Sequence, residues 1–320
     1  MTAPKTATLH PQARALLDLI EERGVPPTHT LTPADAREFY RERRFATQPP
    51  APKAQVRDLL ADGPNGPIPL RLYRPIASSD AAILPVLVYY HGGGFVIGDL
   101  DTHDTLCREL ANLAECAIVA VDYRMGPEHR FPAAVIDCAA ATRWVRDRAA
   151  EFKLDAARLA VGGDSAGGNL AAVVCIDARD KGDLSIKFQL LIYPATDMRR
   201  TAPSHAENGQ GYLLTHETMD YFTGHYIPNP AQLSDWRASP LLHADLSKLP
   251  PALLLTAGFD PLRDEGADYA KRLTAAGNRA GYVHFPRQIH GFLTMGKVID
   301  EANTAVALCA AELRRVLKPS

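Results

Sequence analysis

The stretch LAVGGDSAGGNLAAVVC holds a single serine, Ser165, inside the pattern Gly163-Asp164-Ser165-Ala166-Gly167. The apolar residues before the pattern suit a β-strand, and those after it suit a helix. A G-x-S-x-G pattern in this setting is typical of a nucleophile elbow, in which a strained turn presents the serine hydroxyl. Glycines permit that turn because neighbouring backbone can pass close to them. The alternative, a glycine-rich turn without chemistry, is disfavoured by the strand–turn–helix context.

A serine hydroxyl is a weak nucleophile unless a base accepts its proton, and the base needs an acid that orients it. In a fold of this type the acid and then the histidine follow the serine along the chain. Asp260 comes just after the predicted strand 252–257, and His290 comes after the predicted strand 281–286. The sequence therefore predicts a catalytic triad of Ser165, Asp260 and His290.

Other acids and histidines fit the triad less well. Asp264 and Glu265 fall in the next predicted helix, where surface carboxylates near a helix N-terminus are expected. His284 lies within a predicted strand, which favours a structural role. Four further histidines have no paired acid at a suitable spacing: His205, His216, His225 and His243.

Three consecutive glycines, Gly92 to Gly94, follow His91 at the end of the apolar run 83–90. Without side chains, their backbone N–H groups can point into a cavity and stabilise a negatively charged oxygen. A flexible loop is the alternative. It is less favoured here because the glycines precede the predicted elbow in a chain that also offers a triad.

The elements that position these residues alternate between strands and helices. A hairpin of two partly exposed strands is predicted around DGPNGP, over 54–61 and 68–75. Short, continuous apolar runs predict buried strands at 83–90, 117–123, 158–163, 188–194, 251–258 and 281–286. Helices are predicted at 102–114, 132–150, 166–181 and 261–276. Such alternation indicates an α/β fold with a mainly parallel sheet covered on both faces.

Two segments fall outside this alternation. Residues 1–50 predict an amphipathic helical arm, in which Thr32 caps a second helix that begins at Pro33. The cluster Arg41–Arg44 in that helix predicts a solvent-exposed face. An insertion at about 197–240 is predicted to contain one or two helices and to lie above the carboxyl edge of the sheet. We expect the arm and the insertion to form a cap.

Composition excludes several classes of protein. The chain has 320 residues, a net charge of −2 and a pI of about 6.6, so neither nucleic acid nor an acidic membrane surface is an expected partner. The five cysteines are scattered without metal-ligand spacing, which indicates reduced thiols. No apolar run is long enough to span a bilayer, and we expect a cytoplasmic protein.

Six motifs in this order resemble those of the α/β-hydrolase superfamily, and within it the hormone-sensitive-lipase-like esterases (bacterial lipase family IV). They span about two-thirds of the chain, and the GDSAGG form of the elbow resembles the larger of two subgroups. The motifs are HGGGF (91–95), YRMGPEHRFPAA (123–134), GGDSAGGNLA (162–171), YPATD (193–197), DPLRDEG (260–266) and HGF (290–292).

This resemblance implies an eight-stranded, mostly parallel twisted sheet with a helical cap, and a catalytic domain over 51–320. It implies the same triad, and an oxyanion hole made by Gly93, Gly94 and the N–H of Ala166. It also implies that Arg124 and Glu128 brace the loops behind the site. A homodimer formed along the sheet edge is a further implication.

The expected function is hydrolysis of short- to medium-chain carboxylic esters, without a metal or organic cofactor. Pocket walls are expected from Phe95, Tyr212, Leu213 and Leu214, although cap aromatics can also simply pack the cap. An amidase, lactonase or arylformamidase could use the same triad, because the cap decides among acyl substrates. A non-catalytic small-molecule binder is disfavoured because His290 is present.

Overall fold

Eight strands form one sheet in the order β1-β2-β4-β3-β5-β6-β7-β8 in the computed structural model, which describes residues 7–318. Residues 1–6 of the predicted arm and residues 319–320 lie outside the described residues. The strands are β1 (Ala54–Gly63), β2 (Gly66–Pro75), β3 (Leu84–Tyr90), β4 (Ala117–Val121), β5 (Leu154–Asp164), β6 (Gln189–Ile192), β7 (Ala252–Phe259) and β8 (Ala280–Ile289).

Most neighbouring strands in the sheet are parallel. The hairpin β1–β2 is antiparallel, and β2 also runs antiparallel to β4. The other pairs, from β4–β3 through β7–β8, are parallel. The predicted α/β class and mainly parallel sheet are thus confirmed. Parallel order brings the carboxyl ends of β5, β7 and β8, which precede the predicted triad residues, to one edge of the sheet.

Burial on both faces explains why the sequences of the central strands are continuously apolar. The prediction of a buried strand at 281–286 is wrong, because β8 is the edge strand and is largely exposed. Every residue of β3 is buried. Val86, Val88 and Tyr90 belong to the core on one face, and Leu87 and Tyr89 belong to the core on the other. This division follows from the two-residue period of a strand. A half-exposed strand would have alternated apolar and polar residues instead.

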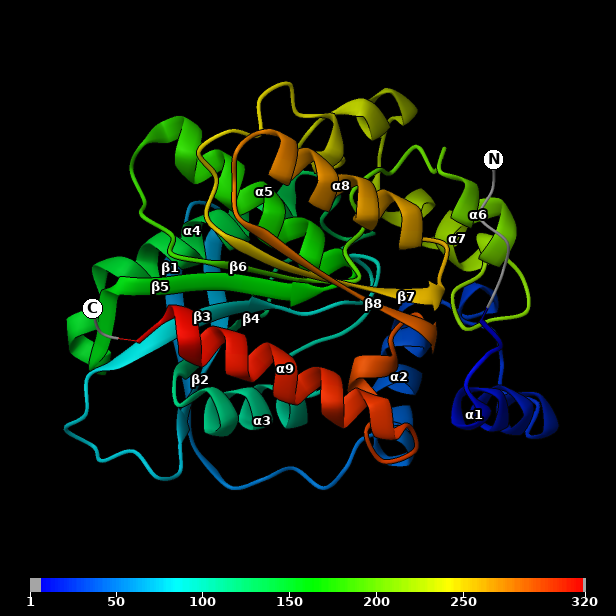
Figure 1. Cartoon of the computed structure of the whole chain (residues 1–320), viewed down its shortest axis with the longest axis horizontal. Coiled ribbons are helices and arrows are strands. Elements are labelled where there is room, and N and C mark those ends of the chain that lie inside the picture. The colour runs from blue at the N-terminus through cyan, green and yellow to red at the C-terminus, as the bar shows by residue number, and fades with distance from the viewer. Residues whose placement is uncertain (1–6, 319–320) are drawn as a thin grey trace.

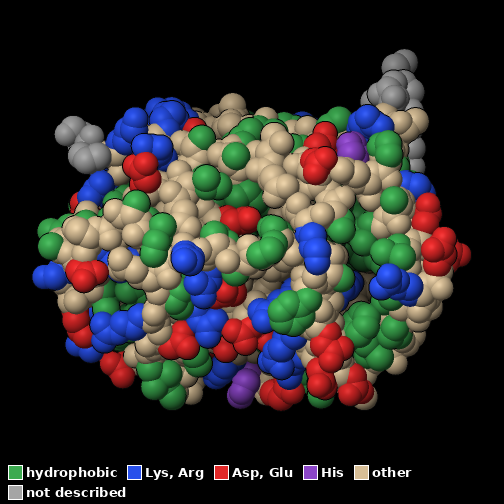
Figure 2. Space-filling model, turned by 90° about the horizontal axis from the view of Figure 1, so that it is seen from below, with side chains coloured by type: hydrophobic (Ala, Val, Ile, Leu, Met, Phe, Trp, Pro, Cys, Tyr) green, Lys and Arg blue, Asp and Glu red, His purple; other side chains and the backbone are tan. Residues whose placement is uncertain are grey.

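Helices cover both faces of the sheet (Figure 1). On one face lie α4 (Ala133–Asp147), α5 (Ala166–Lys181) and α8 (Arg263–Ala275), and on the other lie α3 (Asp104–Ala114) and α9 (Asp300–Val316). The helix α9 was not among the predicted ones. Within residues 7–318, none of the helices combines the length and the apolar character that crossing a bilayer requires. Basic and acidic side chains are interspersed on the face shown in Figure 2.

The cap elements lie beside the carboxyl ends of the parallel strands (Figure 1). The described part of the arm holds α1 (Pro11–Glu22) and α2 (Pro33–Thr47), and the insertion holds α6 (Pro203–Asn208) and α7 (His216–Tyr226). As predicted, Pro33 opens α2 and the Thr32 hydroxyl accepts a hydrogen bond from the Asp35 N–H. Short 3₁₀ turns complete the fold, at Thr28–Thr30, Ala149–Phe152, Pro230–Ser234, Pro240–Leu242 and Phe292–Thr294.

The arm docks against the last part of the chain. His10 donates its backbone N–H to the Arg287 carbonyl at 2.8 Å. The Gln12 amide nitrogen donates to Asp300 Oδ2, also at 2.8 Å. Lys297 donates its backbone N–H to a carbonyl in the last turn of α2, that of Thr47, at 3.0 Å. Contacts between the N-terminal arm and residues 287–300, which are far apart in the sequence, thus hold this part of the cap in place.

Candidate active site

Ser165 stands between β5 and α5 with φ 55° and ψ −116°, outside the regions that non-glycine residues ordinarily occupy. Its backbone N–H donates to the Ile192 carbonyl at 2.8 Å, which ties the turn to the neighbouring strand β6. The turn lifts the side chain from the sheet edge and leaves it half-buried. This is the strained turn that the G-x-S-x-G pattern predicts.

The glycines flanking Ser165 allow close backbone contacts. A Cβ on Gly167 would lie 1.8 Å from the Tyr90 carbonyl oxygen, and a Cβ on Gly163 would lie 2.3 Å from the same atom. No side chain fits at either distance. The glycines therefore let β3 and the start of α5 approach each other directly beneath the serine.

The structure brings the three predicted triad residues together. His290 Nε2 lies 2.9 Å from Ser165 Oγ, and His290 Nδ1 lies 2.7 Å from Asp260 Oδ2. Asp260 is completely buried and His290 is 9% exposed. The strand β8 continues to Ile289, beyond the predicted end at 286, so His290 follows it directly. Such an arrangement can move a proton from the hydroxyl to the imidazole while the carboxylate orients the ring.

The loop that carries Asp260 is held by short contacts. Asp260 Oδ1 accepts a hydrogen bond from the Leu262 N–H at 2.8 Å. The side-chain amide of Asn208, at the end of α6, donates to the carbonyls of Gly258 and Asp260, each at 3.2 Å. The insertion thus supports the backbone on both sides of the buried acid.

Gly93 and Gly94, two of the predicted oxyanion-hole residues, lie in the loop after β3 and line the same cavity as Ser165. Gly93 and Gly94 have φ values of 122° and 60°. The 93 carbonyl accepts hydrogen bonds from the Val96 and Ile97 N–H groups, while no residue between 7 and 318 accepts a hydrogen bond from the N–H of Gly93 or Gly94. These two donors stay available beside the N-terminus of α5, where Ala166 supplies the third predicted donor.

A buried carboxylate that the sequence prediction did not single out anchors this loop. Asp164 Oδ1 accepts hydrogen bonds from the Gly92 N–H at 3.0 Å and from the Tyr89 hydroxyl at 2.8 Å. His103 Nε2 lies 3.2 Å from the same oxygen. Burial opposes ionisation, but the attraction of His103 and the hydrogen bonds from His103 and Tyr89 lower the pKa of Asp164 below its ordinary value. The sequence feature that could have indicated this role is the presence of an acidic residue, Asp164, within the G-x-S-x-G pattern.

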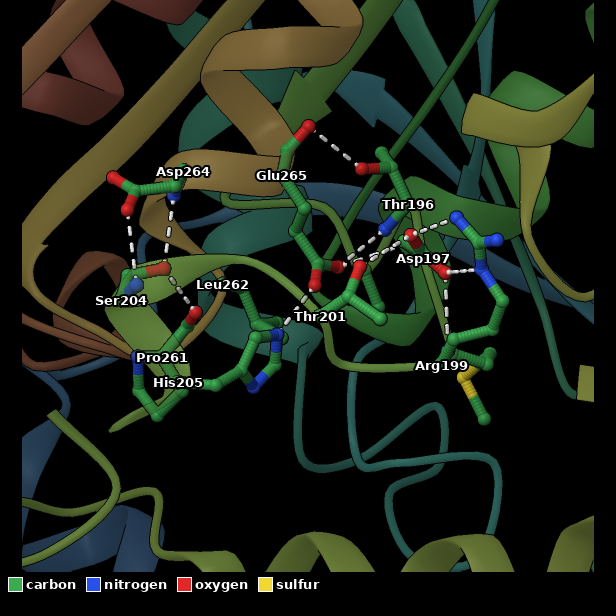
Figure 3. Close-up of polar contacts among 12 residues, drawn as sticks. Thr196, Asp197, Arg199, Thr201, Ser204, His205, Pro261, Leu262, Asp264 and Glu265 are labelled. Carbon is green, nitrogen blue, oxygen red and sulfur yellow. Dashed lines mark hydrogen bonds and ion pairs between the residues drawn. The ribbon is translucent and has the colours of Figure 1, made fainter. Parts of the chain in front are cut away.

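The expectation that Glu265 is a surface carboxylate and that His205 lacks an acid is wrong. Glu265 is 1% exposed and its Oε2 lies 2.6 Å from His205 Nε2, as Figure 3 shows. Its Oε1 accepts hydrogen bonds from the N–H groups of Thr196 and Asp197, at 2.7 and 3.1 Å. Burial raises the pKa of Glu265, and His205 opposes that shift. His205 and Glu265 pair because α6 packs against α8. Spacing along the sequence does not predict such a contact.

Asp264 also serves a structural contact. Its Oδ2 accepts the Ser204 N–H at 2.9 Å, and its own N–H donates to Ser204 Oγ at 3.1 Å. Ser204 Oγ in turn donates to the Pro261 carbonyl at 2.6 Å (Figure 3). The short helix α6 is therefore fastened to the loop that follows Asp260.

One cavity is shared by the catalytic residues and the cap. Phe95, Leu213 and Leu214 line it, as predicted, together with Ser165 and His290. Tyr212 does not line it, because its ring packs on Phe259 with the ring centroids 5.0 Å apart. The alternative stated for cap aromatics, packing within the structure, thus holds for this residue.

Part of the basic cluster in α2 departs from its prediction. Arg41 is exposed, but Arg43 and Arg44 are half-buried and line the same cavity as Ser165. The direction in which α2 faces depends on how it docks. Arg37, on the same helix, donates to the carbonyls of Val96 and Gly126, at 2.8 and 2.7 Å.

The two residues expected to brace the loops both form ion pairs. Arg37 Nη2 lies 2.7 Å from Glu128 Oε2, and the hydrogen bond from Arg37 lowers the pKa of Glu128 to about 2. Arg124 Nη2 lies 2.8 Å from Asp137 Oδ1 in α4. The bracing thus joins the segment after β4 to the arm on one side and to the core on the other.

Comparison with known proteins gives concordant results. Residues 87–294 match the family described as alpha/beta hydrolase fold. The chain is 41% identical over 328 residues to carboxylesterase NlhH of Mycobacterium tuberculosis, covering 99% of each protein. It is 38% identical to the ethyl acetate hydrolase of Pseudomonas putida, covering 97% of this chain and 100% of that one.

Solved structures agree with the sequence relatives. The ester hydrolase EH1AB1 from the metagenome of Lake Arreo, complexed with a derivative of bipyridine phosphonate, is 46% identical. The TM-score is 0.93, and the match covers 96% of this chain and 99% of that chain. By its motifs, its sheet and these relatives, the chain belongs to the α/β-hydrolase family, in the hormone-sensitive-lipase-like group that its motifs resemble.

Proposed function

We propose that the chain is a serine carboxylesterase that hydrolyses short- to medium-chain carboxylic esters through an acyl-enzyme. The observation that carries the proposal is the continuous contact from Ser165 Oγ to His290 to Asp260, at 2.9 and 2.7 Å. The relatives named as carboxylesterase and ethyl acetate hydrolase support it.

The first half of the reaction acylates the enzyme. Ser165 Oγ attacks the ester carbonyl carbon while His290 takes its proton, and Asp260 stabilises the imidazolium that forms. The N–H groups of Gly93, Gly94 and Ala166 donate to the negatively charged oxygen of the tetrahedral intermediate. His290 then gives the proton to the departing alcohol. Water attacks the acyl-enzyme by the same steps and releases the acid.

The cavity supports the preference for modest acyl chains. Apolar side chains from the cap line it together with Ser165, namely Leu213, Leu214, Met219 and Phe222. Phe95 is held in place by stacking on Tyr226, with the ring centroids 4.1 Å apart. A wall made of packed side chains limits the length of chain that can be accommodated.

The test is hydrolysis of p-nitrophenyl esters from acetate to palmitate by wild type and by Ser165→Ala. We expect the highest kcat/KM at short or medium chains and a loss of at least about 10³-fold in the variant. Circular dichroism of the variant checks that it is folded. Absence of turnover on every chain length, or turnover that survives in Ser165→Ala, would contradict the proposal. Matched amide and lactone substrates then identify the acyl compound that is used instead.

A further inference from the structure

Arg43 places a positive charge in the wall of the active-site cavity. It lies in the last turns of α2, and its half-buried side chain lines the cavity that also contains Ser165 and His290. Its guanidinium forms no hydrogen bond and no ion pair with any other residue in the range 7–318, although a guanidinium carries five N–H donors.

The other charged groups in the cavity wall are already engaged. Asp164 is held by His103 and Tyr89, Asp197 lies 2.8 Å from Arg199, and Glu265 lies 2.6 Å from His205. The remaining two wall arginines also have partners.

The partners of these two arginines are not the acidic residues of the cavity wall. Arg200 lies 2.8 Å from Asp220, and Arg44 donates to the backbone carbonyl of Asp101. Arg43 therefore differs from every other charged side chain of the wall, since its donors have no acceptor among the residues that the structure describes.

Arg43 contacts the aromatic ring of Tyr40, which holds the guanidinium in position without neutralising its charge. Its guanidinium carbon lies 5.3 Å from the centre of the Tyr40 ring, a cation–π distance, and Tyr40 lines the same cavity. Burial lowers the pKa of Arg43, and attraction to Tyr40 opposes that shift. A guanidinium remains protonated at neutral pH even so. The cavity thus contains a fixed cation whose donors are unoccupied.

We propose that Arg43 binds an anionic group on the substrate, so that the enzyme prefers esters carrying a carboxylate over neutral esters of the same shape. The inference rests on the proposed esterase function, whose substrate class it narrows. A guanidinium pairs with a carboxylate through two parallel N–H···O bonds, and such bonds are the strong ones. The carboxylate can belong to the acyl part or to the alcohol part of the ester.

Two matched pairs of substrates distinguish these sources. Monomethyl glutarate and methyl glutaramate differ only in a charge on the acyl part. The pair 4-acetoxybenzoate and 4-acetoxybenzamide differ only in a charge on the alcohol part. Release of acid is titrated at pH 7.5 for wild type, Arg43→Gln, Arg43→Lys and Arg23→Gln. Arg23 is exposed at the end of α1 and does not line the cavity, so it controls for loss of one positive charge from the arm.

The quantity compared is the ratio of kcat/KM for the anionic ester to that for its neutral partner. We expect Arg43→Gln to lower this ratio about 10- to 100-fold for at least one pair, as loss of a charge-assisted hydrogen bond predicts. Arg43→Lys should recover part of the loss, and Arg23→Gln should leave the ratio at the wild-type value. The pair that responds identifies the part of the ester that Arg43 contacts.

The inference and the esterase proposal fail in different ways. If wild type hydrolyses the neutral esters and disfavours both anionic ones, or if Arg43→Gln leaves both ratios unchanged, Arg43 only packs on Tyr40 and the inference is wrong. If wild type hydrolyses none of the four, the esterase proposal fails only if the p-nitrophenyl esters are not hydrolysed either. The inference is then decided by calorimetric binding of monomethyl glutarate to wild type, which Arg43→Gln must weaken at least tenfold.

Discussion

His205 Nε2 lies 2.6 Å from Glu265 Oε2, and this buried contact joins α6 of the insertion to the helix that begins just after Asp260. The same carboxylate accepts two backbone N–H groups from the segment after β6. The pair therefore connects the cap, the loop that carries the triad acid and a wall of the cavity. We therefore expect both the stability of the fold and the rate of catalysis to depend on the pair of His205 and Glu265.

Replacing Glu265 by alanine should destabilise the protein and slow the reaction. The change leaves two backbone N–H groups and His205 without their buried acceptor, at a cost of about 3 kcal/mol. The Asp260 loop loses a support as well, so we expect kcat to fall about tenfold. Urea unfolding and ester hydrolysis measure the two effects. Asp268→Ala, an exposed change on the same helix, is the control. If Glu265→Ala has the same free energy of unfolding as wild type, the contact between His205 and Glu265 does not stabilise the protein.

Asp260→Asn tests the role of charge in the triad at almost constant shape. The amide retains the size of the side chain but cannot stabilise the imidazolium, and it favours the wrong tautomer of His290. We expect kcat to fall about 10⁴-fold, as in serine proteases, with little change in KM. Steady-state kinetics on a p-nitrophenyl ester provide the measurement, with Asp268→Asn as the control. A decrease of less than tenfold would assign the role of the acid to another residue.

Gly167→Ala should prevent normal folding of the elbow. The added Cβ would lie 1.8 Å from the Tyr90 carbonyl oxygen, so β3 and α5 must separate. We expect a loss of more than about 3 kcal/mol of stability, or insoluble protein. Gly224→Ala is the matched control, because Gly224 lies in α7 with nothing within 4 Å of an added Cβ. The control should gain about 0.5 to 1 kcal/mol. Equal stability of the two variants would contradict the close approach.

The ion pair between Arg37 and Glu128 predicts a pH dependence of stability. The pKa of Glu128 is lowered from 4.5 to about 2 by the hydrogen bond from Arg37. A depressed folded-state pKa stabilises the protein above the unfolded value, so this contribution is present above about pH 5 and is lost as the pH falls toward 2. The carboxylate is 54% exposed, and screening keeps its contribution below about 1 kcal/mol.

Urea unfolding of wild type and Glu128→Gln at pH 7, 5 and 3.5 measures this contribution. The difference in unfolding free energy should be constant between pH 7 and 5 and smaller at pH 3.5. A difference that is the same at all three values, or that grows in acid, would show that ionisation of Glu128 is not its source.

Local sequence patterns were sufficient to predict most of the buried strands and the three residues, Ser165, Asp260 and His290, that the structure brings into contact. Continuous apolar runs predict buried strands because both faces of the sheet are covered, and Ser165 and Asp260 each lie at the end of such a run. His290 instead follows β8, an edge strand that is largely exposed. The helix α9, which was not among the predicted helices, also shows helical periodicity in its sequence. Its buried residues recur at helical spacing: Ala302, Ala305, Val306, Cys309, Ala310 and Leu313.

Contacts between distant segments could not be predicted in the same way. The helix α6 spans only six residues, too few to show a period, and His205 meets Glu265 60 positions later. The direction of Arg43 depends on the docking of α2, which is set by contacts with the loops near Val96 and Gly126. Tyr212 is directed away from the cavity by its packing on Phe259. The packing of distant elements against one another, rather than local secondary-structure propensity, determines the His205–Glu265 contact and the directions of Arg43 and Tyr212.

The docking of the N-terminal arm on residues 287–300 has a consequence for synthesis. The ribosome makes α1 and α2 well before their partners, among them Arg287, Lys297 and Asp300. A nascent chain therefore has its nucleophile elbow long before it has the histidine or the closed cavity wall. The site is complete only after residues 287–300 have been made, so a nascent chain that stops before His290 lacks the base of the triad.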